Sequence, residues 1–281
     1  MFKASAKVVY NRKIKKGYFE IALLEPAIAK TALPGQFVNI KVSDGLEPLL
    51  RRPLSIHRVR GNKIFLLYEV LGKGTEMLSE KKAVEYLDII GPLGNGFFLN
   101  EPRTANREPR ILVAGGMGTA PLVFLAERLS KRWMKDDSAG ASGRRTIVLI
   151  GAKTKDSILC EKEFKELGCE VKISTDDGSR GFKGFVSELL TQELLTIDHR
   201  LLTIYACGPK LLLKEISRIS LERNIPAQLS LESHMACGIG ACMGCVIKVT
   251  RSPGHQVTRD FKYQRVCKEG PVFEANQILW E

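Results

Sequence analysis

The chain has 281 residues, 44% of them hydrophobic, which is long enough for two or three packed domains. It has no apolar leader after Met1 and no apolar run of about 18 residues, which argues against a secreted or membrane-spanning protein and predicts a cytoplasmic one. The net charge of +12 comes from basic residues scattered among acids without a nucleic-acid-binding motif, so we expect no nucleic-acid and no membrane partner.

The first hundred residues consist of short β-branched runs separated by turns. Six runs at about 10- to 20-residue spacing predict a small antiparallel β-barrel. A short helix is expected within 73–83, before the last strand. The runs cover 7–10, 18–24, 36–42, 51–59, 63–70 and 86–90.

Two features of this region suit an anionic ligand. The run Arg51 to Ser55 places two arginines and then a hydroxyl on a predicted strand, where they could bind a phosphate and hydrogen-bond a heterocycle. A charged strand edge is the alternative. The glycine turn Gly72 to Thr75 precedes the expected helix and could hold a second phosphate.

After Arg110, strands alternate with helices, which predicts a parallel α/β sheet. The first unit is an apolar strand over 110–114, a glycine turn and a helix over 121–129. Further strands are expected at 146–150, 170–174 and 203–206, with helices around 161–167 and 211–224.

The turn after Ala114 reads Gly-Gly-Met-Gly-Thr-Ala-Pro and lacks the third glycine of G-x-G-x-x-G. Proline is well tolerated in the first helical turn, and the free amides there would hold a pyrophosphate. Because the turn follows the first parallel strand, nucleotide binding is favoured over tight packing alone. The predicted binding residues are Gly115, Gly116, Gly118, Thr119 and Pro121.

Cys207 ends the last predicted strand of the sheet, at the carboxyl edge where such sheets bind ligands. Its position predicts a catalytic role, with an inert buried thiol as the alternative.

Four cysteines near the C-terminus have the spacing of a cluster ligand set. Cys237, Cys242 and Cys245 form C-x4-C-x2-C, and Cys267 is a distant fourth, as in plant-type [2Fe-2S] proteins. Small residues between them let the backbone wrap tightly around a cluster. Zinc is the main alternative, but zinc sites usually combine two C-x2-C pairs, and only one occurs here. Structural thiols are a further alternative.

The segment from about residue 226 onward is predicted to be mostly irregular, without a core of its own. One hairpin is expected, in which 246–249 pairs with 256–259. We expect a bound cluster to supply much of the folding free energy of this segment.

Taken in order, the motifs resemble those of the electron transfer subunits of NAD-dependent dihydroorotate dehydrogenase B, a branch of the ferredoxin reductase superfamily. The resemblance covers nearly the whole chain. Its motifs are Arg-Pro-Leu-Ser55, Gly-Lys-Gly-Thr75, Gly-Pro-Leu-Gly-Asn-Gly96, the glycine turn up to Pro121, Thr-Asp-Asp-Gly-Ser179, Cys-Gly-Pro209, and the stretch from Ser230 through the cysteines to Phe273.

The resemblance implies a multidomain β and α/β protein. Its parts would be an antiparallel FAD-binding barrel of the ferredoxin reductase type over 1–103, a parallel-sheet NAD-binding domain over 104–225 and a small C-terminal [2Fe-2S] domain over 226–281. Leu54, where plant-type reductases prefer tyrosine, favours the dihydroorotate branch.

The same resemblance implies roles for individual residues. Cys207 would lie near the flavin and the nicotinamide, and the four cysteines would hold the cluster. The flavin and its phosphate would contact Arg52, Pro53, Leu54 and Ser55, the isoalloxazine or ribityl region Glu69, Val70 and Leu71, and the pyrophosphate Gly74 and Thr75.

The implied function is electron transfer in pyrimidine biosynthesis: a partner oxidises dihydroorotate to orotate at its FMN, single electrons cross the cluster, and FAD passes a hydride to NAD+. The implied partner is an FMN-containing dihydroorotate dehydrogenase catalytic subunit, in a heterotetramer. Two alternatives stay open. One is an NAD(P)H reductase subunit of a hydrogenase, a sulfide dehydrogenase or a ferredoxin-dependent bifurcating complex; the other is a zinc-stabilised basic binding module without flavin.

Overall fold

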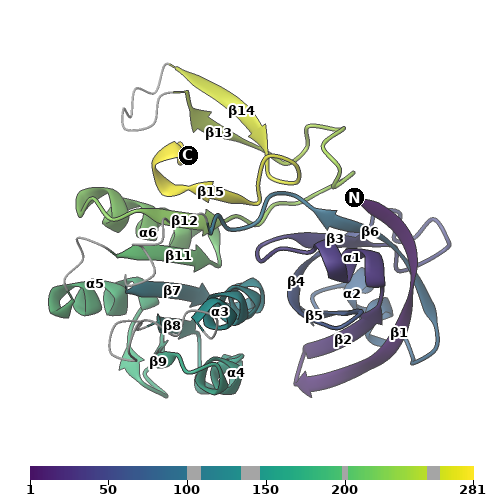
Figure 1. Cartoon of the computed structure of the whole chain (residues 1–281), viewed down its shortest axis with the longest axis horizontal. Helices are drawn as coiled ribbons and strands as arrows, with labels where there is room; N and C mark the ends of the chain where they lie inside the picture. Colours follow the sequence, from purple (N-terminus) through teal and green to yellow (C-terminus); the bar gives the residue numbers. More distant parts are fainter. Residues whose placement is uncertain (100–108, 134–145, 198–201, 252–259) are drawn as a thin grey trace.

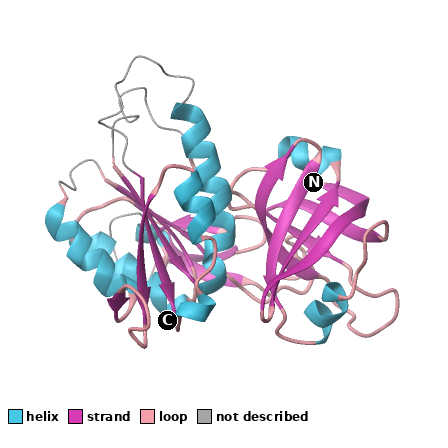
Figure 2. Cartoon of the chain, turned by 90° about the horizontal axis from the view of Figure 1, so that it is seen from below, coloured by secondary structure: helices cyan, strands magenta, loops and turns pink. Residues whose placement is uncertain are grey.

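The computed structural model describes residues 1–99, 109–133, 146–197, 202–251 and 260–281. Figures 1 and 2 show a β-barrel and an α/β unit side by side, and Figure 1 shows the last strands above the α/β unit. None of the helices in these ranges has the length and apolar character needed to cross a bilayer.

The N-terminal strands close into the expected six-stranded antiparallel barrel, in the order β1-β2-β5-β4-β3-β6. Alternate side chains of the strands point inward and form a core that includes Ile21, Ile40 and Leu66. A helix that we did not predict, α1, begins at Pro26, and the Glu25 side chain caps it. The elements are β1 (Phe2–Lys15), β2 (Tyr18–Leu24), α1 (Pro26–Thr31), β3 (Phe37–Ile40), β4 (Arg52–Arg60), β5 (Lys63–Glu69), α2 (Lys73–Ser79) and β6 (Tyr86–Leu93).

The second unit is a seven-stranded sheet in the order β10-β9-β8-β7-β11-β12-β15. All pairs are parallel except β12 with β15. The strands β7 and β8 are buried on both faces, which explains their continuous apolar sequences. The elements are β7 (Arg110–Gly115), α3 (Thr119–Trp133), β8 (Thr146–Ala152), α4 (Glu161–Glu166), β9 (Glu170–Thr175), β10 (Phe182–Lys183), α5 (Val186–Thr196), β11 (Thr203–Cys207), α6 (Lys210–Glu222) and β12 (Ala227–Ser230).

The C-terminal segment leaves the sheet after β12 and returns to it in β15 (Val272–Glu274). Between them, β13 (Val246–Thr250) pairs with β14 (Phe261–Arg265) in a hairpin, with Val246 opposite Arg265. The first strand was predicted, but the pairing with 256–259 was wrong, because the partner strand begins later in the chain, at Phe261. Residues 256–259 lie outside the described residues. Val249, Val266 and Phe273 pack into the same apolar cluster as Ile111 and Leu229, so this segment shares the core of the α/β unit.

Helix α3 joins the two units by packing against β4 of the barrel. Buried Glu127 on α3 lies 3.4 Å from Arg58 Nε and 3.3 Å from Arg60. His57 Nδ1 donates a hydrogen bond of 3.0 Å to the Ala120 carbonyl. Burial and the positive charge of Arg58 lower the pKa of His57 to about 4, so the imidazole is neutral at pH 7.

The connections of the sheet fix where a ligand can bind. From β7 the chain crosses to β8 on one side, and it later returns to β11 on the other side. The carboxyl ends of β7 and β11 therefore border the crevice of a topological switch point. Gly115 to Gly118 follow the first strand and Gly208 the second, and this edge faces β4 and β5 of the barrel.

Candidate functional site

A cleft of about 500 Å³ lies between the barrel and the carboxyl edge of the sheet. This volume is in the usual range of cofactor pockets. The barrel contributes Arg52, Pro53, Leu54, Ser55, Glu69, Leu71 and Thr75; the α/β unit contributes Met117, Ala120 and Cys207; and the segment after β12 contributes Glu232, Ser233, His234 and Met235.

The predicted flavin-strand motif, Arg51 to Ser55 at the start of β4, and the glycine turn before α2 are in direct contact. A Cβ atom on Gly74 would lie 2.2 Å from Arg52 Nε, so only glycine allows the guanidinium to lie against this turn. The Thr75 hydroxyl accepts hydrogen bonds from the Leu71 and Gly72 amides, at 3.0 and 3.3 Å, and fixes the turn. The two separate sequence signals therefore form one cationic wall of the cleft. Among the predicted flavin contacts, Val70 instead packs against the barrel core.

The glycine turn after β7 is shaped by close packing. A Cβ atom on Gly118 would lie 2.0 Å from the Cys207 carbonyl oxygen, and one on Gly115 would lie 2.6 Å from Leu212. Gly116 has a φ of +52°, which favours glycine, and its missing side chain would point into open space. Packing thus explains Gly115 and Gly118, whereas Gly116 leaves room for a ligand to approach the backbone.

The rest of the turn prepares the start of α3. The Thr119 hydroxyl donates to the Gly116 carbonyl at 3.0 Å, and Pro121 occupies the first helical turn. The side chains of this turn that line the cleft are those of Met117 and Ala120, which alternate in the sequence with the predicted contact residues. A 3-10 turn over Gly116–Gly118 directly precedes α3, and its carbonyls accept a hydrogen bond from the Thr119 amide. The amides at the start of this 3-10 turn have no helical partner, which suits a pyrophosphate here.

Cys207 forms part of the cleft wall and is only 2% exposed. Burial raises the pKa of its thiol far above the ordinary value, and the negative charge of Glu232 raises it further. Burial also raises the pKa of the Glu232 carboxyl. Cys207 is therefore a neutral thiol at pH 7, which can contact a flavin or nicotinamide ring but is not an activated nucleophile.

Glu232 lies in the family motif that begins at Ser230, but nothing in the sequence indicated that its side chain lines the cleft. It follows β12, the strand next to β11, and thus reaches the same edge of the sheet as Cys207. A prediction of β12 as a parallel strand would have placed Glu232 at this edge.

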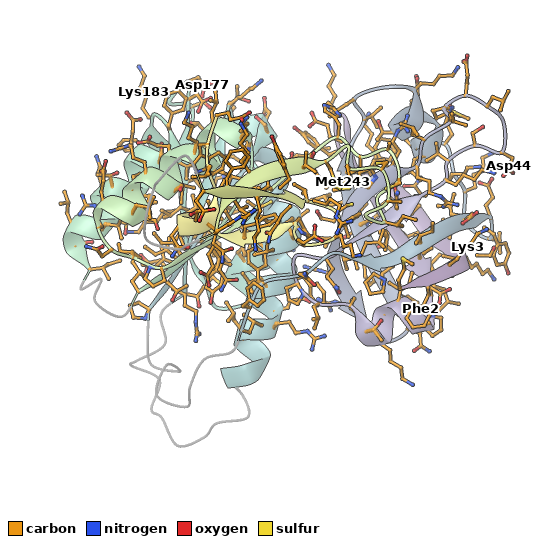
Figure 3. All side chains as sticks on the ribbon, turned by 90° about the horizontal axis from the view of Figure 1, so that it is seen from above. Phe2, Lys3, Asp44, Asp177, Lys183 and Met243 are labelled. Carbon is orange, nitrogen blue, oxygen red and sulfur yellow. The ribbon has the colours of Figure 1, made fainter. Side chains whose placement is uncertain are left out.

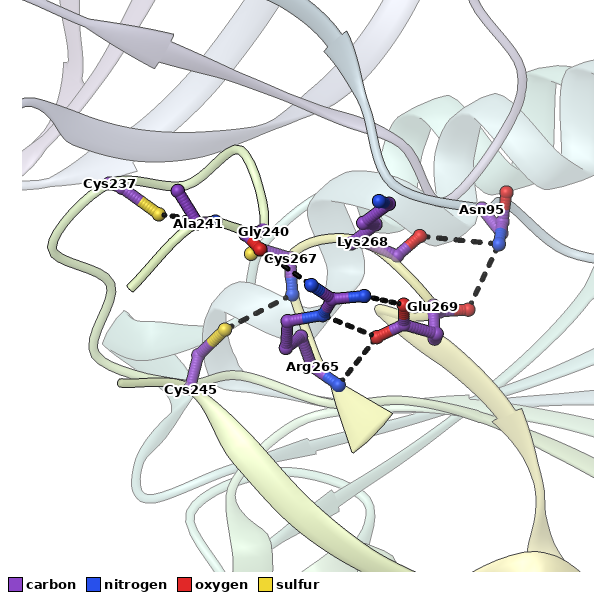
Figure 4. A network of polar contacts seen from close by, with 9 residues as sticks. All are labelled: Asn95, Cys237, Gly240, Ala241, Cys245, Arg265, Cys267, Lys268 and Glu269. Atoms are coloured by element: carbon purple, nitrogen blue, oxygen red, sulfur yellow. Dashed lines mark hydrogen bonds and ion pairs between the residues drawn. The ribbon is translucent and has the colours of Figure 1, made fainter. Parts of the chain in front are cut away.

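The four cysteines of the C-terminal segment come together in one site, and Figure 4 shows three of them, Cys237, Cys245 and Cys267. Cys237 Sγ accepts hydrogen bonds from the Ala241 and Cys242 amides at 3.3 and 3.4 Å, and Cys245 Sγ accepts one from the Cys267 amide at 3.4 Å. Burial alone would raise the pKa of Cys237, but backbone hydrogen bonds to its sulfur lower it to about 6. Backbone donors aimed at thiolates are the environment of an iron–sulfur cluster, so these residues fit the group.

Cys267 behaves differently because it is the inner member of the set. Burial, a hydrogen bond with Cys245 and the charge of that neighbour raise the pKa of Cys267 to about 12. Two thiols this close compete for one proton, and a metal that binds both removes the competition.

The Arg265 side chain links the turn that carries Cys267 to the loop that carries the other three cysteines. The Arg265 side chain donates to the Gly240 carbonyl at 2.6 Å and binds the Glu269 carboxylate through two nitrogens (Figure 4). Asn95, from the barrel side, donates to the Lys268 and Glu269 carbonyls at 3.3 and 3.0 Å. The turn that carries Cys267 is therefore tied both to the cysteine loop and to the barrel.

The site is open on one side. Cys242 is exposed, whereas Cys245 and Cys267 are buried, and the loop side chains Ile239 and Met243 are 42% and 50% exposed. Figure 3 shows Met243 between the α/β end, where Asp177 lies, and the barrel end, where Asp44 lies.

Comparisons with known proteins agree with this arrangement. The model of the iron-sulfur cluster binding domain of dihydroorotate dehydrogenase B matches residues 232–279, and the oxidoreductase NAD-binding domain matches residues 112–218. Fold and site thus define an oxidoreductase of the ferredoxin reductase type, with an iron–sulfur segment after its nucleotide domain. The chain belongs to the family of dihydroorotate dehydrogenase B (NAD+) electron transfer subunits.

Two relatives support the assignment. The subunit of this name from Desulforamulus reducens is 40% identical, over 100% of this chain and 99% of that protein. The one from Geobacillus sp. (strain WCH70) is 39% identical, over 97% of this chain and 96% of that protein.

Solved structures agree on the fold. The NADH-dependent reduced ferredoxin-NADP oxidoreductase, described for flavin-based electron bifurcation, is 28% identical with a TM-score of 0.80 and covers 99% of this chain and 90% of that chain. A ferredoxin NADP+ reductase from Neisseria gonorrhoeae with bound FAD and NADP is 13% identical with a TM-score of 0.63, over 78% of this chain and 91% of that chain. It shows the fold alone. The predicted fold class is confirmed.

Proposed function

We propose that the chain passes electrons between the FMN of a partner subunit and NAD+, in the oxidation of dihydroorotate to orotate in pyrimidine biosynthesis. Its cofactors are FAD, a [2Fe-2S] cluster and NAD. The cluster carries single electrons and the flavin exchanges two, so the two groups together connect a one-electron donor with a hydride acceptor.

One observation carries the proposal. Ser233, His234 and Met235 line the cleft, and Cys237, the first cluster ligand, is two residues after Met235. The same short segment therefore borders the flavin site and begins the cluster site, which leaves only a short distance for electrons to cross.

The residues of the cleft have separate tasks in this proposal. Arg52, Pro53, Leu54 and Ser55 on β4 contact the flavin and its phosphate. Glu69 and Leu71, with the backbone of Val70 between them, border the isoalloxazine or ribityl region, and Gly74 with Thr75 borders the pyrophosphate. Support comes from the contact of Arg52 with Gly74 and from the exposure of most of these side chains to the cleft.

On the other wall, the turn from Gly115 to Pro121 binds the pyrophosphate of NAD, and Cys207 is the catalytic residue at the junction of nicotinamide and flavin. Its neutral thiol excludes water from this junction without adding charge. The close approach of Gly118 to the Cys207 carbonyl supports the proposal, because it brings the nucleotide turn next to this thiol.

The name of the relatives implies a catalytic partner subunit. We assign it as an FMN-containing dihydroorotate dehydrogenase, in a heterotetramer of two subunits of each kind, in the cytoplasm. The exposed rim at Cys242 and Met243 supports a partner that docks over the cluster. We also propose the domain boundaries 1–103, 104–225 and 226–281.

A second candidate is the NAD(P)H reductase subunit of a ferredoxin-dependent bifurcating complex. It is favoured by the likeness over 99% of the chain to the NADH-dependent reduced ferredoxin-NADP oxidoreductase. Both candidates share the cleft and the cluster and differ in the partner.

The test starts with protein purified without oxygen. We expect one FAD, two irons and two acid-labile sulfides per chain, and an absorption spectrum that NADH bleaches. Co-purification with an FMN protein that oxidises dihydroorotate distinguishes the first candidate from the second. Zinc in place of iron, together with absence of flavin, would contradict both.

A further inference from the structure

Asn39 is the polar residue in the middle of β3, between three buried apolar side chains. Phe37, Val38, Asn39 and Ile40 are all buried, and Asn39 is 0% exposed. A buried amide costs free energy that an aliphatic side chain of similar size does not. The polar side chain at this point therefore requires a local reason.

The backbone of Asn39 belongs to the flavin side of the molecule. β3 pairs with β4, and Asn39 lies directly opposite Pro53 of the flavin-strand motif. The same β4 residues line the cleft. The position of Asn39 is thus fixed relative to the strand that binds FAD in the proposed function.

The side chain of Asn39 reaches the cluster loop. Its Nδ2 donates a hydrogen bond of 3.2 Å to the carbonyl oxygen of Cys237, the first cluster ligand. A Cβ atom on Gly238 would lie 2.4 Å from this Nδ2, and Gly238 has a φ of +68°. The loop thus takes a left-handed glycine conformation where it packs on the amide.

The amide is committed to this contact. Its Oδ1 is buried and has no hydrogen-bond partner among the described residues. An unpaired buried acceptor costs about 1 to 3 kcal/mol. Asn39 thus keeps the Nδ2 contact with Cys237 although its Oδ1 forms no hydrogen bond within the described residues. This points to a role beyond filling space in the barrel.

We propose that Asn39 is a positioning residue that connects the flavin strand to the cluster and raises the reduction potential of the cluster. The inference rests on the proposed function. The positive end of the amide dipole lies against the peptide that carries Cys237, and it stabilises the added electron of the reduced cluster. Hydrogen bonds and dipoles around the ligands are known to set the potential of such centres.

The test compares Asn39→Asp, which keeps the shape but removes the donor, and Asn39→Leu, which fills the same space without polar atoms. Asn11→Leu is the matched control. Asn11 is also a barrel asparagine that donates to backbone carbonyls, those of Leu78 and Lys81 at the end of α2. The readouts are iron and FAD content, the potential of the cluster in an EPR-monitored redox titration, and the rates at which NADH reduces first the flavin and then the cluster.

We expect both Asn39 variants to shift the potential downward and to slow cluster reduction about tenfold, the effect of one hydrogen bond. Flavin reduction and FAD content should stay at the wild-type level. Loss of iron with retention of FAD, absent in Asn11→Leu, would also support the inference.

Two outcomes would overturn it. The first is a wild-type potential and rate in both Asn39 variants with full iron content. The second is joint loss of FAD and iron in the Asn39 variants, which indicates a role in barrel folding alone. Failure of the proposed function is distinct, because the wild-type cluster would then not be reduced by NADH.

Discussion

At the scale of single residues, chemistry that is local in sequence was predictable and chemistry that depends on tertiary contact was not. The four cysteines could be assigned because their spacing specifies the ligand set. Nothing in the sequence singles out Glu232 or Asn39. Their roles depend on Cys207 and Cys237, respectively, which only the folded chain brings near them.

The thiol of Cys207 provides a prediction about the hydride step. In Cys207→Ala the cleft loses a side chain where nicotinamide and flavin are proposed to meet, so water can enter. We expect flavin reduction by NADH to slow about tenfold, with FAD and iron content unchanged. Stopped-flow absorbance measures this rate, and Cys169→Ala, just before β9, is the control. An unchanged rate in Cys207→Ala would remove the residue from the catalytic step.

His57 provides a prediction about pH. Its pKa is about 4 in the folded protein, against 6.5 for an unperturbed imidazole, so within this window the unfolded chain binds a proton that the folded chain does not. Stability should be full above pH 6.5, fall as pH drops and level off below 4, with a total loss of about 3 kcal/mol. Arg58, Arg60 and Glu20 are the charges around it.

The measurement is the melting temperature between about pH 7.5 and 5 for the wild type and His57→Gln. The variant should show a shallower decline, whatever its stability at neutral pH. Parallel curves for the two proteins would show that another group causes the dependence.

At the scale of elements, the barrel strands, β7 to β9, β11 and even the short α4 were predictable, whereas α1, α5, β12 and β15 were missed. The buried strands β7 and β8 could be found because both faces are apolar. Strands β12 and β15 have four and three residues and acquire their pairing only from the neighbouring sheet. The same reason hid the attachment of the C-terminal segment to the core of the α/β unit.

The Arg265 salt bridge should determine how firmly the cluster is held. Arg265→Leu removes the bonds to Glu269 and to the Gly240 carbonyl, so the turn of Cys267 separates more easily from the cysteine loop. We expect iron to leave severalfold faster in the presence of a chelator, measured by loss of visible absorbance. The control is Arg218→Leu on α6, which breaks a similar pair with Glu215 and Glu222 on the surface. Equal rates in the two variants would contradict the assignment.

At the scale of the whole molecule, the sequence indicated the parts but not how they meet. The barrel was predictable from its series of short strands, and the α/β sheet from its alternation of strands and helices. Their interface includes individual side-chain contacts, such as those of His57 with Ala120 and of Arg58 with Glu127. No sequence pattern predicts such contacts. Because the cleft lies between the two units, its shape follows from this interface.

Glu127 tests that dependence. Glu127→Gln leaves the largely buried Arg58 without its opposite charge, which should cost about 2 kcal/mol of stability. We expect a lower melting temperature and faster loss of FAD on dilution, followed by flavin fluorescence. Retention of FAD at the wild-type level in a destabilised variant would show that the cleft does not depend on this contact.

The return of the chain to the sheet in β15 has a consequence for how such a molecule can be built. The Leu231 amide donates to the Pro271 carbonyl at 2.9 Å, and Ser230 pairs with Val272, so the segment between them starts and ends at one point. It is an excursion from what would otherwise be a plain antiparallel hairpin. The segment between Leu231 and Pro271 can therefore differ in length without changing the order of the strands in the sheet.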